Sequence, residues 1–187
     1  MTCLSTRLIL AAAAAAAVVL CCCGVASAAG DTVADSCAAI RDFVDASFCE
    51  ARLRSVPGAA TADRHGHLLM AADLAAASGA TAGDAAARLA SAPGDPAAQD
   101  ALRACGFLYG SASVPALRLM RGYAAARSWG AARSLLMLTG YAGNGCDAAL
   151  GGGGGAKGKT MAGVDREFHQ LSAMATALLN AVANGGR

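Results

Sequence analysis

Alanine constrains this chain more than any other residue type. About fifty of the 187 residues are alanine, and 56% of the chain is hydrophobic. Alanine has the highest intrinsic helix propensity. β-Branched residues are scarce: Ile40 is the only isoleucine after Ile9, and the valines are mostly scattered singly. Neither a buried parallel sheet nor a β-sandwich can be built from this supply. The composition therefore predicts one all-α domain.

The charge balance excludes two further classes of protein. Only 15% of the residues are charged, and the formal net charge is +2. A disordered chain combines low hydrophobicity with high net charge, which is not the case here. A nucleic-acid-binding domain carries a strong basic patch, and a near-neutral balance supplies none. We therefore expect a folded protein without a nucleic-acid partner.

The first 28 residues have the three parts of a secretory signal peptide. Arg7 precedes an apolar run over 8–23, and Ala26-Ser27-Ala28 follows as a cleavage site. The run is shorter than the roughly 20 residues that a membrane-spanning helix needs, so an anchor is the weaker interpretation. We predict cleavage after Ala28, secretion of 29–187 to the extracellular space, and no membrane association of the mature protein.

Four cysteines remain after the leader is removed: Cys37, Cys49, Cys105 and Cys146. An even number in an exported chain indicates disulfides, and four cysteines allow three connectivities. The sequence-local choice is Cys37–Cys49 with Cys105–Cys146. Zinc ligation is the alternative, but the sequence has no C-x-x-C pair among these four. We expect no metal and no cofactor.

Helical periodicity divides the mature chain into a hairpin, 29–58, and an antiparallel up-down four-helix bundle, 59–187. Two short helices within 31–54 are closed by the Pro57-Gly58 turn. Four longer segments follow, and short breaks between long helices favour antiparallel neighbours. Their expected helical residues span 61–91, then 96–123, then 129–139, and finally 164–182.

Three local signals refine these helices. Asp95 is an expected N-cap with Pro96 at the first helical position. Pro115 is expected to kink or split the second bundle helix. Gly143-Asn144-Gly145 is expected to end the third helix, and 151–155 to be a flexible linker. The predicted core stripe of the second helix is Leu102, Cys105, Tyr109, Ala112, Ala116, Leu119 and Tyr123; that of the fourth is Val164, Phe168, Leu171, Ala175, Leu178 and Val182.

Residues 153–160 match the phosphate-binding pattern G-x-x-x-x-G-K-[ST], which makes nucleotide binding a remote alternative function. In that motif Lys159 and Thr160 would hold phosphate and Mg²⁺. The motif needs a preceding hydrophobic strand, and Cys146 to Leu150 supplies no β-branched residue. A run of five glycines also makes a chance match common. A solvated linker is the preferred interpretation.

No constellation of catalytic residues emerges from the sequence. His65 and His67 are two residues apart, diverge on a helix, and are predicted to be a surface pair. His169 and Glu167 are likewise two apart. Asp73, Asp84 and Asp100 are expected on solvated helix faces, and Ser172 lacks a G-x-S-x-G setting. The sequence therefore predicts that the protein is not an enzyme.

Cationic and aromatic residues gather around one helix–helix turn instead. Arg, Tyr and Trp are the residue types enriched at binding hot spots. These residues are a candidate contact surface, and core aromatics beside a solvated basic rim account for the pattern at least as well. The candidate residues are Arg121, Tyr123, Arg127, Trp129 and Arg133, with Arg118 nearby.

Several segments together resemble the plant invertase and pectin methylesterase inhibitor family. Residues 44–49, which end at Cys49 and precede Leu53, resemble the family's second-cysteine segment. Residues 101–105 with Leu108-Tyr109 resemble its third-cysteine motif, and Leu138-Thr139 lies seven residues before Cys146 as in the family. Residues 61–63, 73–75 and 170–173 resemble the starts of its first and last bundle helices. In pattern the chain is closest to the pollen-allergen branch.

The resemblance implies a small inhibitor of the cell wall or apoplast with first–second and third–fourth disulfides and no catalytic residues. The family's pectin methylesterase inhibitors cover the target's cleft, whereas its invertase inhibitors insert a Pro-Lys-Phe tripeptide before the third bundle helix. Here that stretch is 124–129, Ala-Ala-Ala-Arg-Ser-Trp. The absence of Pro-Lys-Phe favours pectin methylesterase as the partner, with acid invertase (β-fructofuranosidase) as the alternative.

Overall fold

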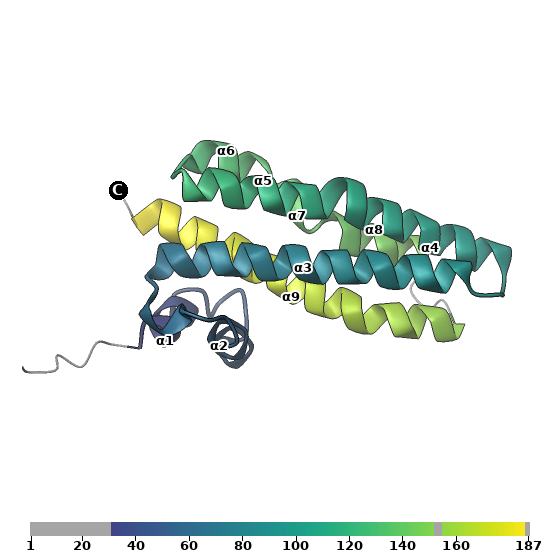
Figure 1. The fold of residues 1–187 in the computed structure, drawn as a ribbon, viewed down its shortest axis with the longest axis horizontal. Helices are drawn as coiled ribbons and strands as arrows, with labels where there is room; N and C mark the ends of the chain where they lie inside the picture. The colour runs from purple at the N-terminus through teal and green to yellow at the C-terminus, as the bar shows by residue number, and fades with distance from the viewer. Residues whose placement is uncertain (1–30, 152–154, 186–187) are drawn as a thin grey trace, which may run out of the picture. The chain divides into compact units, whose positions relative to one another are not determined.

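The computed structural model describes residues 31–151 and 155–185, with side chains from 158 onward in the second range. The predicted leader and residues 152–154 of the predicted linker lie outside these ranges. The described residues are helical and contain no strand. Figure 1 shows the helices in chain order. They are α1 (Thr32–Ala38), α2 (Ala46–Arg54), the 3₁₀ turn η2 (Ala59–Thr61), α3 (Arg64–Ser91), α4 (Pro96–Leu108), the π-turn η3 (Tyr109–Ser113), α5 (Val114–Ala125), α6 (Trp129–Ser134), α7 (Leu136–Thr139), α8 (Tyr141–Ala149) and α9 (Gly155–Gly185).

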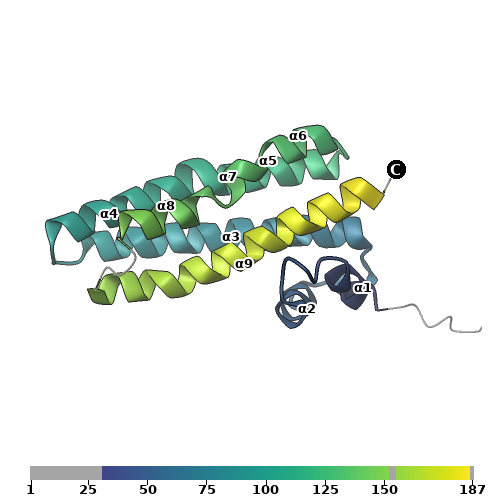
Figure 2. The same cartoon turned by 180° about the vertical axis from the view of Figure 1, so that it is seen from behind.

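Four helical segments form the expected up-down bundle. α3 packs against α9 on one side and against α4 and α5 on the other. α4, η3 and α5 run on as the second bundle helix, and α6, α7 and α8 together make the third. α8 packs against α4 and α9, which closes the ring of neighbours. Figure 2 shows α9 crossing diagonally in front of α3.

Small residues bring these helices close together. The buried face of α3 carries alanines almost throughout, including Ala71, Ala75, Ala82 and Ala86. A Cβ built at Gly79 would lie 2.8 Å from Cγ2 of Val114 and 2.9 Å from Cε2 of Phe168. The phenyl ring of Phe168 in turn meets Tyr109 edge-on, with centroids 5.0 Å apart. Alanine and glycine on α3 therefore make room for the few large side chains of its neighbours.

The predicted disruption at Pro115 is present, as a π-turn. Proline has no N–H to donate and clashes with the carbonyl four residues earlier, so a regular turn before it is disfavoured. η3 inserts one extra residue into this turn. Beyond it the core face moves one residue along, to Ser113, Leu117, Met120 and Ala124. The prediction that Leu119 and Tyr123 are core residues was therefore wrong: they are 55% and 42% exposed.

The third bundle helix also differs from its prediction. Instead of one helix to Thr139, it is broken into α6, α7 and α8. Gly143-Asn144-Gly145 lies inside α8 and does not end the helix. A Cβ at Gly143 would lie 2.3 Å from Nε2 of His169, and one at Gly145 would lie 2.6 Å from Cδ1 of Leu108. These glycines serve close packing between helices rather than a turn.

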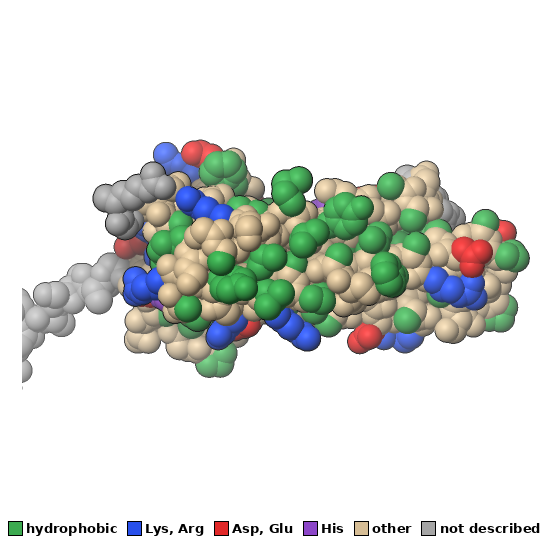
Figure 3. Space-filling view, turned by 90° about the horizontal axis from the view of Figure 1, so that it is seen from above, with side chains coloured by type: hydrophobic (Ala, Val, Ile, Leu, Met, Phe, Trp, Pro, Cys, Tyr) green, Lys and Arg blue, Asp and Glu red, His purple; other side chains and the backbone are tan. Residues whose placement is uncertain are grey.

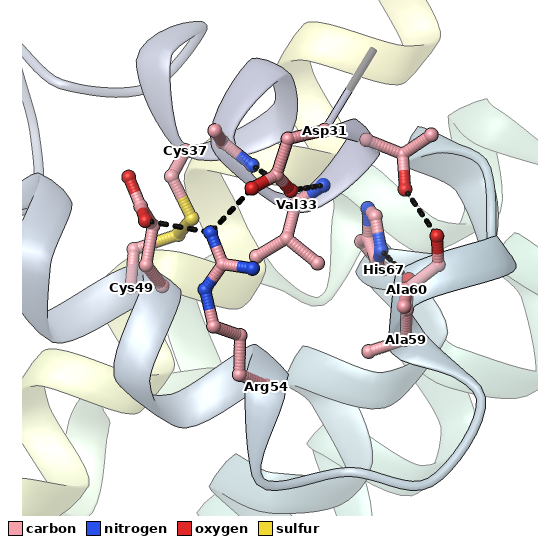
Figure 4. Close-up of polar contacts among 11 residues, drawn as sticks. Asp31, Val33, Cys37, Cys49, Arg54, Ala59, Ala60 and His67 are labelled. Atoms are coloured by element: carbon pink, nitrogen blue, oxygen red, sulfur yellow. Dashed lines mark hydrogen bonds and ion pairs between the residues drawn. A yellow bond between two sulfur atoms is a disulfide. The ribbon is translucent and has the colours of Figure 1, made fainter. Parts of the chain in front are cut away.

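Aspartates cap both helices of the N-terminal hairpin, and a disulfide joins the two helices. Asp31 and Asp45 cap α1 and α2 by accepting backbone N–H bonds. Arg54 donates to the carboxylates of Asp31, at 2.6 Å, and Glu50, at 2.9 Å (Figure 4). This pairing lowers the pKa of Asp31, with the capping N–H groups acting in the same direction. A disulfide joins Cys37 to Cys49, and a second joins Cys105 to Cys146. This is the sequence-local pairing.

His67 fastens the hairpin to the bundle, which contradicts its prediction as a surface residue. Its side chain is completely buried. Nδ1 lies 2.8 Å from Oγ of Ser36 on α1, and Nε2 lies 2.8 Å from the carbonyl oxygen of Ala59 in η2 (Figure 4). A carbonyl can only accept, so Nε2 carries the proton and Nδ1 accepts from the serine. His65, two residues earlier, is half-buried and faces α5.

Candidate contact surface

The turn between α5 and α6 is built around a residue in an unusual backbone conformation. Arg127 has φ +56°, and it is the only non-glycine residue with positive φ in the described ranges. The amide of Ser128 donates to the carbonyl of Tyr123, and the amide of Arg127 donates to that of Ala124, each at 2.9 Å. This is the Schellman pattern, in which the left-handed position is usually glycine. The turn therefore presents an exposed arginine at some backbone cost.

Trp129 anchors this turn to the start of α3. Its indole meets the His65 ring edge-on, with centroids 5.7 Å apart. Nε2 of His65 lies 2.9 Å from the carbonyl oxygen of Ala124, the last buried residue of α5, and donates to it. The tryptophan remains partly exposed. The aromatic group is thus held in a fixed position on the surface.

The other candidate residues flank the turn on two sides. Nε of Arg121 donates to both carboxylate oxygens of Asp73 on α3, at 3.1 Å each. Nη2 of Arg133 donates to Oδ1 of Asn184 on α9, at 2.6 Å, while its Nε is buried and makes no hydrogen bond. Tyr123 is exposed between them in sequence. The structure thus places all five candidate residues at the end of the bundle that carries the α5–α6 turn. Arg121 contacts α3 there, whereas Arg133 contacts α9.

Exposed hydrophobic side chains extend this surface along the bundle. Leu119 and Tyr123 lie on α5, which packs against α7, where Met137 and Leu138 are also exposed. Met137 is 85% exposed, which is unusual for a large apolar side chain. Figure 3 shows hydrophobic groups gathered over the part of the molecule that carries α5 to α7, with arginines at the margin. An apolar centre with a basic rim suits binding to another protein.

A polar cluster inside the bundle escaped the sequence analysis. Tyr109 of η3 donates its hydroxyl hydrogen to Oδ1 of Asp165 on α9, and the carboxyl group is almost fully buried. Oδ2 of Asp165 lies 3.8 Å from Nε2 of His169. Burial raises the pKa of Asp165 to about 6, and the negative charge of Asp147 adds to this shift. Burial and the bond to Asp165 also raise the pKa of Tyr109. The only sequence signal was the four-residue spacing of Asp165 and His169 on one helix face.

The phosphate-binding pattern does not have the local structure that the motif needs. The part of it that the structure describes, residues 155–160, lies in the first turns of α9. The described segment before it, Tyr141–Ala149, is the helix α8 rather than a strand. The motif needs a strand that leads directly into the glycine-rich loop, and the described residues before 152 form a helix instead.

The described residues form a small helical bundle that is cross-linked by two disulfides. The chain belongs to the plant invertase/pectin methylesterase inhibitor family, whose sequence model matches residues 31–178. Members of this family are inhibitors and not enzymes, and membership implies an inhibitor of one of these two enzymes. No curated protein matches the chain significantly. No helix in the described residues is both long enough and apolar enough to span a membrane.

Proposed function

We propose that this protein is a secreted inhibitor of pectin methylesterase, and that it occludes the enzyme's active-site cleft with the surface around the α5–α6 turn. We choose pectin methylesterase as the target because of the sequence and conformation of the α5–α6 turn. Residues 126–128 hold Arg127 in a left-handed conformation and contain no Pro-Lys-Phe. The tripeptide with which the family's invertase inhibitors are expected to enter their target is therefore missing.

Charge and shape support this choice. The resemblance implies that the cleft of pectin methylesterase carries acidic groups, and the turn presents an exposed guanidinium from Arg127. Trp129 is fixed beside it by His65. A rigid aromatic anchor loses little conformational entropy on binding, and a complementary charge steers association. The exposed side chains of Leu119 and Met137 would add apolar area to the same interface.

The backbone conformation of Arg127 also supports a role for its side chain in binding. A non-glycine residue in the left-handed region costs about 1 kcal/mol relative to glycine, so glycine would be the stabler choice at position 127. Strain of this kind is concentrated at functional sites. The guanidinium of Arg127 therefore has a role that the fold alone does not require.

The target is tested by a paired inhibition assay. The full chain is expressed in a eukaryotic secretory host, and the protein is purified oxidised from the medium. It is titrated against a plant pectin methylesterase and against a cell-wall acid invertase at acidic pH. We expect dose-dependent loss of methylesterase activity with invertase unaffected. Loss of invertase activity alone would replace the proposed target with the alternative one.

The contact surface is tested separately with two variants and a matched control. Arg127→Ala and Trp129→Ala should each weaken inhibition tenfold or more, the range typical of hot-spot residues. Arg88→Ala removes an exposed arginine from the last turn of α3, whose first turn contacts α5, and should leave inhibition unchanged. Unchanged inhibition by both turn variants, with circular dichroism confirming their fold, would place the contact surface elsewhere.

Secretion forms part of the same proposal. The apolar run 8–23, the Ala26-Ser27-Ala28 site and the two disulfides support export to the apoplast. N-terminal sequencing of the secreted protein should begin at Ala29. Retention in the cell with an intact N-terminus would contradict the proposal.

A further inference from the structure

We propose that Asp147, Asp165 and His169 form a binding site for one divalent transition-metal ion, of which Zn²⁺ is the best fit. The three side chains come from the neighbouring bundle helices α8 and α9, and none belongs to the α5–α6 turn. One donor atom from each residue lies within 4.8 Å of the others. The cluster is therefore separate from the contact surface proposed above.

The geometry needs little adjustment to hold an ion. Asp165 and His169 are four residues apart and therefore share one face of α9. Oδ2 and Nε2 are 3.8 Å apart. Ligand atoms about 2.1 Å from a tetrahedral zinc ion lie about 3.4 Å from one another. Side-chain rotations that close the cluster by at most about 1.4 Å would therefore complete three corners of the site, with water at the fourth.

The charge arrangement favours a cation at this point. Two carboxyl groups converge here, and Asp165 is only 3% exposed. Like charges at such a position repel unless a proton or a cation lies between them. The imidazole of His169 completes a mixed nitrogen and oxygen donor set. Oxygen-only sites suit Ca²⁺ and Mg²⁺, whereas a set containing imidazole favours zinc and its neighbours in the transition series.

The surrounding residues already orient these ligands. The Tyr109 hydroxyl donates a hydrogen bond to Oδ1 of Asp165, and the other oxygen, Oδ2, faces His169. The ring of His169 packs against α8 at Gly143, where no Cβ intervenes. The disulfide Cys105–Cys146 fixes α8 against α4 immediately before Asp147. Partners of this kind hold a ligand set in position, and losing one typically weakens metal binding 10- to 100-fold.

Solvent can reach two members of the cluster. Asp147 is exposed on α8. His169 lines an open hollow of about 350 Å³ together with Phe43, Val44 and Gln170. An ion therefore has an entry path that does not require the bundle to open.

The test is calorimetric titration of the oxidised, metal-stripped secreted protein with Zn²⁺ alone. We expect one ion per chain and a rise in the midpoint of thermal unfolding, because the ion would join α8 to α9. Asp147→Asn and His169→Gln should each weaken binding tenfold or more. Tyr109→Phe should weaken it by a smaller factor. Asp84→Asn, which removes an exposed carboxylate from α3, is the matched control and should bind as the unmodified protein does.

Three results of the titration would contradict the proposal. Absence of saturable binding would overturn the proposal, as would binding that neither Asp147→Asn nor His169→Gln weakens. Tighter binding of Ca²⁺ than of Zn²⁺ would overturn the proposed class of ion. Asp147 is exposed, so its asparagine variant should fold even if changes at the buried Asp165 do not.

Discussion

Arg127 shows how one residue can bring fold and function into conflict. Its position in the Schellman turn calls for glycine, and the chain supplies an arginine with φ +56°. Its charge and position make it a candidate contact residue in the sequence, which carries no signal for its backbone conformation. Left-handed conformation at a non-glycine residue depends on how the following helix is held, and here Trp129 and His65 hold it.

We predict that Arg127→Gly stabilises the protein by about 1 kcal/mol, because glycine adopts the left-handed conformation without strain. Urea unfolding monitored by circular dichroism would measure the change. Arg127→Ala, which keeps the strain and removes the guanidinium, is the control and should be nearly neutral. A loss of stability in the glycine variant would show that the side chain contributes more to the fold than its exposure indicates.

His67 is the residue for which a local rule failed. The two-residue spacing indicated that His65 and His67 diverge on the helix, but it did not reveal which of the two faces the core. Burial follows from the hairpin packing onto α3, which no periodicity within α3 encodes. Ser36 on α1 and Ala59 in η2 provide the partners for both ring nitrogens.

We predict that His67→Ala lowers the free energy of unfolding by about 2–4 kcal/mol. The substitution leaves a cavity, and the buried Ser36 hydroxyl and Ala59 carbonyl lose their hydrogen-bond partner. The half-buried His65 provides a comparison, and His65→Ala should cost less. Denaturant unfolding of both variants checks the order. Equal small losses would mean that the hairpin is not held through His67.

At the scale of elements, the sequence predicted helices better than it predicted their breaks. The capping signal placed the start of α4 correctly, with Asp95 as its N-cap. The stripe of the last helix was also correct for its central residues, from Phe168 to Leu178. Breaks that depend on packing were missed: the extra residue of η3 moves the core face of α5, and the glycines of α8 look like a helix end in sequence.

The glycines of α8 give a direct test of this interpretation. Gly143→Ala should destabilise the protein by about 1–3 kcal/mol, because its Cβ would overlap the ring of His169 and overpack the contact. Gly163→Ala on α9 has nothing within 4 Å and should stabilise the helix by about 1 kcal/mol. Thermal unfolding of the two variants should therefore shift in opposite directions. A neutral Gly143→Ala would show that α8 and α9 can separate without cost.

At the scale of the whole molecule, alanine-rich helices make a thin core that disulfides reinforce. Few large side chains are fully buried, and Phe168, Tyr109 and Leu102 are among them. The fold class could be predicted because composition favours helices throughout, and the cysteine pairing could be predicted as the sequence-local choice that the family resemblance also implies. The polar cluster of Asp147, Asp165 and His169 could not, because it joins residues of α8 and α9 across the bundle.

The two disulfides should differ in their effect on stability. Cys105–Cys146 closes the longer loop, with 41 residues of separation against 12 for Cys37–Cys49. Loop-closure entropy then gives about 4 kcal/mol for the former and about 3 for the latter. Denaturant unfolding of the two paired Cys→Ser variants should reproduce this order. A larger loss from removing Cys37–Cys49 would show that the hairpin contributes more to stability than its loop length indicates.

The central claim is that the α5–α6 end of the bundle is the inhibitory surface. Amide hydrogen exchange, measured on the free protein and on its complex with pectin methylesterase, tests this claim most directly. We predict that exchange slows across 121–134 in the complex and stays unchanged at 86–100, around the α3–α4 connection. Slowed exchange at 86–100 with none at 121–134 would contradict the account and place the target at the opposite end of α3.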